Sequence, residues 1–220
     1  MTIHELRRYT LLPGRRDELI TLFEREFVEA QEAAGMRVSG TFRDPDAPDT
    51  FTWLRSFPDM EARRAALEAF YTGPVWLAHR EAANATLVDS DDVLLLRALT
   101  EPPAADRPGV GASALPAAEY VATVYPVGDG FPAFFAEVVA PALAEAGARP
   151  VARFVTEHAE NTFPRLPVRS GENVFVWFAR FPEAGAGAGL AAVDLPLVEN
   201  RLTGAPQRMR LRPTARSAMR

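Results

Sequence analysis

The sequence predicts an α+β fold in which two ferredoxin-like repeats, each of order β-α-β-β-α-β, pack sheet to sheet as one α/β barrel within the chain. Aromatic strand-like segments recur at residues 51–58 and 175–182. Each follows a helix-like stretch that ends in Ala-Gly, at Gly35 and Gly147, so a whole structural unit repeats, as in a tandem duplication. Apolar side chains on both faces of these strands require helices on one side and a second sheet on the other.

The first repeat is predicted over residues 1–99, because the spacing of its apolar residues changes between the period of a strand and the period of a helix. Three-to-four spacing indicates helices packed on a sheet, the turn at 44–49 is rich in Asp and Pro, and Asp59 is suited to cap a helix. The expected elements are strands over residues 3–12, 36–43, 50–57 and 93–99 and helices over 15–34, 59–71 and 74 to about 84.

A second, diverged repeat is predicted over residues 118–213, after a linker rich in Pro and Gly at 100–117 and before a tail at 214–220. Its first helix is expected to bend at Pro141. Repeated glycines at 184–189 form helix poorly, so the second helix is expected over 190–201. The expected strands are residues 120–125, 151–158, 173–181 and 207–212.

Composition excludes several classes of function. The chain has 220 residues, a net charge of -5 and no cysteine, which argues against nucleic acid as a partner and against thiolate or disulfide chemistry. Arginines near the end are expected on a solvated strand face and tail. No apolar run suits membrane insertion, and we expect a cytoplasmic protein. Glycine-rich phosphate loops and spaced metal-ligand pairs are also missing from the sequence, so we predict no metal and no cofactor.

Several segments resemble the NIPSNAP family. The resemblance lies in Glu5 to Leu11, the Trp53 strand and, most specifically, residues 70–86, with the order Gly-Pro-x-Trp-x-x-His-Arg. In the second repeat, residues 161–168 and the Trp177 strand look like the C-terminal half of bacterial tandem members, without counterparts of Trp76 or His79. The resemblance implies a dimeric α/β-barrel topology and a site that occurs once per chain, but no established reaction. Relatives in the wider superfamily include cofactor-free quinol monooxygenases, polyketide cyclases and haem-binding enzymes, so haem on His79 is an alternative by analogy alone.

The main candidate site surrounds the Gly73-Pro74 break, which is expected to turn a helix face back to the sheet. Trp76, His79 and Arg80 share that face, and an aromatic wall, an imidazole and a fixed cation suit a ligand pocket. In the alternative reading Trp76 anchors the core, His79 bonds a backbone carbonyl and Arg80 pairs with a carboxylate. The predicted catalytic residues are His79 and Arg80, with Tyr71, Trp76 and Asn84 at the same break binding substrate.

Two further segments supply candidate substrate-binding residues. Glu5, Arg7 and Tyr9 share one face of the first strand, as either a polar network inside the barrel or the floor of a site. Trp53 and Arg55 share a face of the third strand. The long insert that carries Phe163 and Arg165 is expected either to cover the barrel mouth or the sister domain, or to be a variable surface loop.

Two functions fit these residues. One is a small-molecule-binding or interaction module of unassigned activity, in which the aromatic residues fill a pocket or the core. The alternative is a cofactor-independent enzyme, similar to a monooxygenase or cyclase, in which His79 transfers a proton and Arg80 or Arg7 holds an enolate or phenolate oxygen. The expected partner is an apolar, aromatic or polyketide-like small molecule, with pairing to a second copy of the chain left open.

Overall fold

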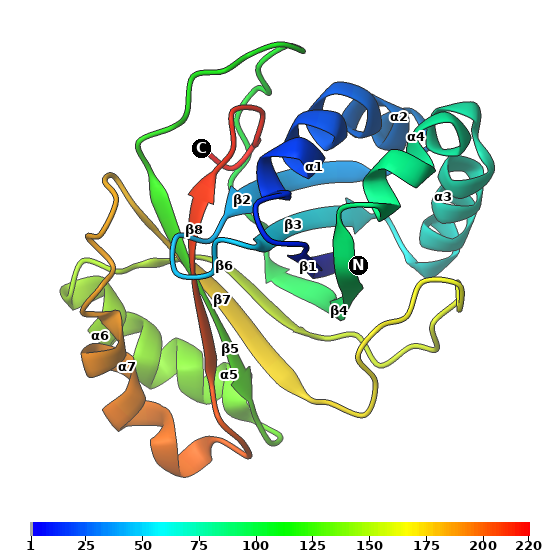
Figure 1. Ribbon diagram of the computed structural model, residues 1–220. Helices are drawn as coiled ribbons and strands as arrows, with labels where there is room; N and C mark the ends of the chain where they lie inside the picture. The colour runs from blue at the N-terminus through cyan, green and yellow to red at the C-terminus, as the bar shows by residue number, and fades with distance from the viewer. Residues whose placement is uncertain (1) are drawn as a thin grey trace.

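The computed structural model describes residues 2–220 and contains a closed, antiparallel, eight-stranded barrel with helices on its outside (Figure 1). The strands are β1 (Ile3–Leu11), β2 (Arg37–Arg43), β3 (Thr50–Phe57), β4 (Leu87–Thr100), β5 (Glu119–Pro126), β6 (Pro150–Thr156), β7 (Val174–Phe181) and β8 (Gln207–Pro213). The helical segments are α1 (Arg16–Leu22), η1 (Phe23–Phe27), α2 (Val28–Ala33), α3 (Met60–Thr72), α4 (Pro74–Asn84), α5 (Phe131–Phe134), η2 (Phe135–Val139), α6 (Ala140–Glu145), α7 (Leu190–Val198) and η3 (Glu199–Arg201).

Each half of the chain contributes one four-stranded sheet, in the order β4-β1-β3-β2 for the first half and β6-β7-β5-β8 for the second. The two sheets join edge to edge where β2 meets β8 and where β4 meets β6. Both halves have the order β-α-β-β-α-β. The predicted α+β fold, with two ferredoxin-like sheets closed into one intrachain barrel, is therefore confirmed.

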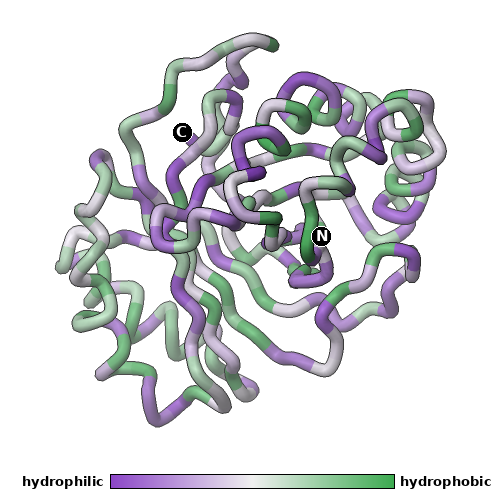
Figure 2. Tube along the Cα trace, in the orientation of Figure 1, coloured by the Kyte–Doolittle hydropathy of each residue, from purple (hydrophilic) through white to green (hydrophobic). Residues whose placement is uncertain are grey.

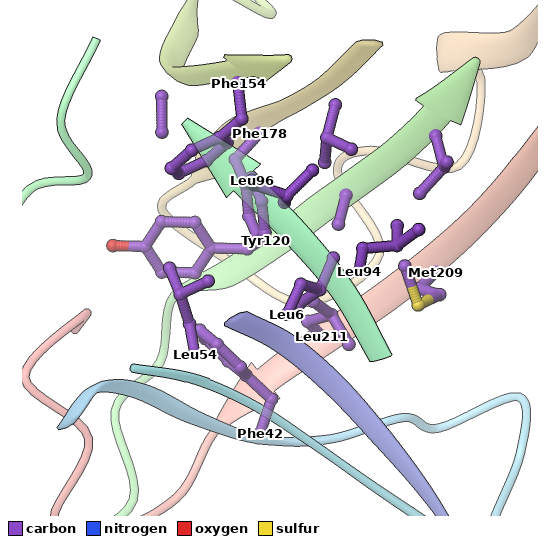
Figure 3. Close-up of a cluster of buried hydrophobic side chains, with 14 of the residues drawn as sticks. Leu6, Phe42, Leu54, Leu94, Leu96, Tyr120, Phe154, Phe178, Met209 and Leu211 are labelled. Atoms are coloured by element: carbon purple, nitrogen blue, oxygen red, sulfur yellow. The ribbon is translucent and has the colours of Figure 1, made fainter. Parts of the chain in front are cut away.

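The barrel interior is a hydrophobic core shared by both halves. Leu6, Leu54 and Leu94 from the first half meet Tyr120 and Phe178 from the second (Figure 3). These side chains are almost completely buried. Apolar burial across this contact stabilises the association of the two sheets, so each half completes the core of the other.

The outer face of each sheet is covered by its own helices. Trp53 lies in the cluster beneath the first-half helices and Trp177 in the cluster beneath the second-half helices. Hydrophilic and hydrophobic residues both occur along the first-half helices (Figure 2), as expected for helices that pack one face on a sheet. The two tryptophans are 2% and 0% exposed, which agrees with the prediction that both faces of these strands are covered.

Each half has a π-helical segment, η1 or η2, in the middle of its first helix. Pro141 lies in the first turn of α6, directly after η2. Because α6 continues directly from η2, Pro141 lacks an N–H group that an uninterrupted helix would use. The irregularity predicted at Pro141 thus falls on the preceding π-helical segment, and the equivalent irregularity in the first half carries no proline.

The prediction of a solvated tail at residues 214–220 is wrong. Arg216 is 3% exposed, and its guanidinium contacts Glu29 and the carbonyl oxygen of Pro108. Thr214 bonds Thr41 of β2 through their hydroxyl groups at 2.6 Å, and Met219 enters the barrel core. This segment is buried because β2 and β8 pair over only two residues, which leaves room beside β2.

Gly40 of β2 allows this close approach. A Cβ atom at position 40 would lie 2.9 Å from the sulfur of Met219 and 2.5 Å from the ring of Phe42. Both distances are too short for ordinary van der Waals contact.

None of the helices within residues 2–220 has the length and apolarity that a bilayer crossing requires.

Candidate functional site

A buried ionic network lies on the helix-facing side of the first-half sheet. The carboxylate of Glu5 receives Arg7 Nη1 at 2.8 Å, Arg55 Nε at 2.7 Å and Arg63 Nε at 2.7 Å. Glu5, Arg55 and Arg63 are 0% exposed and Arg7 is 1% exposed. Adjacent strands create the cluster, because Glu5 of β1 lies directly opposite Arg55 of β3.

Neutral groups accept further hydrogen bonds from the guanidinium groups, although Arg63 Nη2 is buried without a partner. Arg7 Nε donates to Tyr9 Oη at 3.0 Å and Arg55 Nη1 donates to Gln31 Oε1 at 3.0 Å. The Glu5-Arg7-Tyr9 stripe forms a polar network, as one of its two readings predicted, but the predicted place inside the barrel is wrong, because Leu6, on the opposite face of β1, enters the barrel. The stripe points outward because adjacent residues of a strand face opposite sides.

Charge in the network controls the pKa of Glu5. Burial alone would raise the pKa of this carboxyl, but the opposing charges of Arg55, Arg7 and Arg63 hold it well below its usual range. Burial raises the pKa of Tyr9, and the positive charge of Arg7 offsets only part of that effect. At neutral pH, Glu5 is therefore ionised and Tyr9 keeps its proton.

A cavity of about 120 Å³ lies next to the network, between the first-half sheet and its helices. Trp76 of α4 packs against Tyr71 with ring centroids 4.8 Å apart and against Phe27 at 5.6 Å. The lining is mainly aromatic and aliphatic, with few polar groups. It comprises Tyr9, Leu19, Phe23, Phe27, Gln31, Trp53, Phe70, Tyr71, Trp76, Ala83, Asn84, Leu87, Ser90 and Leu166.

The loop at residues 157–173 of the second half reaches this cavity of the first half. The yellow loop in Figure 1 extends from β6 and β7 toward α3. Phe163 stacks on Tyr71 with ring centroids 6.0 Å apart and planes 26° apart. Asn161 Oδ1 accepts from Arg63 Nη1 at 3.0 Å, and Leu166 lines the cavity. Of the readings left open for this insert, covering the sister half is the one that agrees with these contacts.

The structure separates the two predicted catalytic residues from the cavity. Trp76 and Ala83 of α4 line it, but His79 lies at the helix edge, where its Nε2 is 3.5 Å from Glu26 Oε2 and its side chain is 32% exposed. Arg80 is exposed. The expectation that both converge with Tyr71 and Trp76 on one cavity is wrong, because α4 is the outermost layer and only its innermost residues reach inward.

The remaining predicted residues divide in the same way. Tyr9, Trp53, Tyr71, Trp76 and Asn84 line the cavity. Glu5, Arg7 and Arg55 form the network beside it. Phe163 stacks on Tyr71 of the cavity wall, whereas Arg165 is exposed, with its guanidinium carbon 6.0 Å from the centroid of the Phe163 ring.

Sequence reasoning missed Arg63, Gln31 and Asn161. Arg63 occupies the buried stripe of α3 together with Ala66, Leu67 and Phe70. A charged residue within an apolar stripe was the available signal, because burial of a charge requires a partner. Gln31 likewise lies one turn after Phe27 on the buried face of its helix. No local pattern marks Asn161, since its role depends on a contact between the two halves.

The second half has different polar groups between its sheet and its helices. Tyr125 of β5 donates its hydroxyl hydrogen to the fully buried carboxylate of Asp194, which also pairs with Arg208. Arg208 Nε donates to Thr123 Oγ1 at 3.1 Å. Burial and the negative charge of Asp194 together raise the pKa of Tyr125 far above its usual value. Within residues 2–220, no group of three or more His, Cys, Asp or Glu residues is placed to hold a metal ion.

Comparison with known proteins gives one family match and several structural likenesses. Residues 4–100 match the NIPSNAP family. No curated protein matches the chain significantly. A crystal structure of an anthrone oxidase-like protein has a TM-score of 0.62 at 15% identity, covering 100% of this chain and 94% of its own.

Two bacterial proteins provisionally assigned as monooxygenases have similar structures. The protein from Fusobacterium nucleatum has a TM-score of 0.62 at 8% identity, covering 97% of this chain and 92% of its own. The protein from Lactobacillus acidophilus has a TM-score of 0.61 at 10% identity, covering 99% of this chain and 96% of its own. At these identities the likenesses show a shared fold.

Proposed function

We propose that the first half of this chain, whose residues 4–100 match the NIPSNAP family, binds a small aromatic molecule. The observation that carries the proposal is the aromatic cavity covered by Phe163 and Leu166 of the other half. Cavities with apolar walls and few polar groups suit small ligands. The first half contributes the walls and the second half the cover, so the proposed site depends on the complete barrel.

The volume of the cavity limits the ligand. An apolar cavity of roughly 150 Å³ accepts benzene in another protein, and this cavity measures about 120 Å³. A single aromatic ring therefore matches the space available. A fused polyketide-like ligand would require the 157–173 loop or α4 to move outward.

A cavity-filling variant tests this proposal. Ala83 lies on the cavity wall and is 3% exposed, so Ala83→Leu places three extra carbon atoms in the space a ligand would use. Benzene and toluene should raise the melting temperature of the parent protein but not of this variant. Ala78→Leu, on the exposed side of the same helix, is the matched control and should respond like the parent.

The outcomes are distinct. Loss of the ligand response in Ala83→Leu with a retained melting temperature supports the site. If no single-ring compound stabilises the parent protein, or if Ala83→Leu responds as the parent does, the proposed cavity is not the binding site.

A cofactor-independent oxidase is a second candidate. It is favoured by the hydrogen bond that Arg7 Nε donates to Tyr9 Oη beside the cavity, because this bond makes the Tyr9 hydroxyl a stronger donor to an enolate oxygen. In such a reaction O₂ oxidises a ring CH₂ to a carbonyl, with one oxygen atom entering the product and the other leaving as water. Anthrone is the test substrate. Its three fused rings exceed the cavity volume, so its oxidation would also show that the 157–173 loop or α4 moves outward to admit it. Oxygen consumption with anthrone that is lost in Tyr9→Phe favours the oxidase; its absence with retained ring binding favours the binding module.

The catalytic roles of His79 and Arg80 remain predictions that the same assay tests. Because both side chains lie outside the cavity lining, we expect His79→Ala and Arg80→Ala to keep ligand binding.

We also infer a tandem duplication, supported by π-helical segments at matching places in both halves. A cytoplasmic location and pairing with a second copy of the chain remain predictions, to be checked by cell fractionation and by light scattering.

A further inference from the structure

The buried network beside the cavity carries more positive than negative charge. Three guanidinium groups share the single carboxylate of Glu5. Among the described residues, Glu5 is the only acid within 4.0 Å of these three groups. The other partners, Tyr9, Gln31 and Asn161, are neutral. Two formal positive charges therefore remain without an opposite charge among buried side chains, which is unfavourable unless an anion is nearby.

Two hydrogen-bond donors on the cavity wall lack acceptors. Tyr9 Oη accepts from Arg7 Nε at 3.0 Å, so its own hydrogen is free, and no described residue accepts it. Trp53 Nε1 is buried and has no partner. Both residues line the cavity. An unpaired buried donor such as Trp53 Nε1 is rare in folded proteins and indicates a missing acceptor, and the partly buried Tyr9 hydroxyl lies on the same cavity wall.

The excess charge lies close to these donors. The guanidinium carbons of Arg55 and Arg7 are 5.0 Å and 5.7 Å from the centroid of the Trp53 ring. Arg7 is also hydrogen bonded to Tyr9, which increases the ability of the hydroxyl to donate. Donors of this kind hold an anionic oxygen more strongly than a neutral one.

We propose that the cavity selects a one-ring aromatic molecule with an anionic oxygen, either a phenolate or a carboxylate, which accepts hydrogen bonds from Tyr9 Oη and Trp53 Nε1. This inference rests on the proposed binding function and names the class of ligand. The aromatic walls contact the ring, and the guanidinium groups neutralise the charge through their field. A phenol bound here ionises at a lower pH than in water, because nearby positive charge favours its anion.

Three probes separate charge recognition from ring recognition: 4-nitrophenol, whose anion is yellow, benzoate, and the neutral 4-nitrotoluene. Binding is measured by calorimetry, and the ionisation of 4-nitrophenol by visible absorbance. We expect the bound 4-nitrophenol to be yellow at a pH where the free compound is colourless. Benzoate and 4-nitrophenol show which anionic oxygen the site accepts, and binding of either one, more tightly than 4-nitrotoluene, supports the inference.

The test variant is Tyr9→Phe, which keeps the ring and removes the donor. Loss of a hydrogen bond to a charged group predicts about 10-fold to 100-fold weaker binding of the anion, with binding of 4-nitrotoluene unchanged. The matched control is Tyr125→Phe, on β5 of the second half, which should leave all three affinities unchanged. If Tyr9→Phe fails to fold, Trp53→Phe removes the other donor and should weaken the anion in the same way.

Two results overturn the inference in distinguishable ways. If 4-nitrotoluene binds as tightly as either anion and 4-nitrophenol stays colourless, the anion preference is wrong and the proposed ring-binding function survives. If none of the three probes binds, the proposed function itself is wrong.

Discussion

In the first half, Glu5 of β1 lies opposite Arg55 of β3, whereas the matching pair of the second half joins Val121 of β5 to Ala179 of β7. Two residue pairs further along, Arg7 lies opposite Trp53 and Thr123 lies opposite Trp177. The tryptophan is common to both halves, but the charges are not. The second half has only uncharged residues at these positions, so the fold does not require an ionic network there.

The second half places its buried charge elsewhere. Asp194 of α7 and Arg208 of β8 pair with each other, and Tyr125 donates to Asp194. Here one acid meets one base, and the other buried acid of the second half, Glu119, pairs with Arg210 and Arg212, which are both partly exposed to solvent. In the first half one acid meets three guanidinium groups that are all buried, and this unbalanced cluster next to a cavity is the feature that we assign to binding.

Truncating the shared tryptophans should have the largest effect on stability. Trp53→Ala and Trp177→Ala each remove a fully covered side chain and should lower the free energy of unfolding by about 3–5 kcal/mol. Urea denaturation of both variants measures it. Similar losses would show that the two clusters are energetically equivalent, whereas a loss below about 1 kcal/mol in either variant would contradict the packing described for that half.

Removing the charge of Glu5 should have the next largest effect. Glu5→Gln leaves three buried guanidinium groups without a counter-ion, which should cost about 3 kcal/mol. Val121→Ala, at the equivalent strand position, removes only apolar contacts and should cost clearly less in the same denaturation experiment. Equal losses at both positions would mean that the charged and apolar versions of this position contribute alike.

Cutting the contact between the halves should have a smaller effect. Asn161→Ala removes the acceptor of Arg63 Nη1 and two hydrogen bonds within the loop, and should cost about 2 kcal/mol. Glu160→Ala, in the exposed part of the same loop, is the control and should be nearly neutral. A larger effect in the control would show that the loop, rather than its contact with Arg63, determines stability.

Acid should remove the contribution of Glu5 gradually. The pKa of Glu5 is lowered on folding, so its stabilising effect is complete above its unfolded pKa of about 4.3 and is lost as the pH falls toward the folded pKa. The stability difference between the parent and Glu5→Gln should therefore be constant near neutral pH and shrink below about pH 4. A difference that grows on acidification would contradict the assigned pKa direction.

In alkali, the loss of stability should come mainly from Tyr125 of the second half. The raised pKa of Tyr125 gives stability that is complete below its unfolded pKa of about 10 and is lost as the pH rises beyond it. Tyr125→Phe should therefore show a weaker loss of stability in alkali than the parent. Tyr9 has a raised pKa too, so Tyr9→Phe measures the share of the first half.

Periodicity and repetition were enough to predict the barrel, because Trp53 and Trp177 mark matching strands and the helices between them have regular stripes. The same reasoning brought Tyr9, Trp53, Tyr71 and Trp76 to one site, where all four line the cavity. It misplaced His79 and Arg80 because a shared helix face is wider than the part of it that reaches inward. Arg63 and Asn161 meet across 98 residues of sequence, and no local pattern encodes such a contact.

The return of residues 214–220 to β2 also has a kinetic consequence. Thr41 and Thr214 are separated by 173 residues of sequence, and contacts of such long range form slowly because a large loop must close first. Until they form, the outer edge of β2 offers unpaired backbone groups to other chains. Refolding at high protein concentration should therefore divide between slow closure of the barrel and aggregation through this edge, with dilution favouring closure.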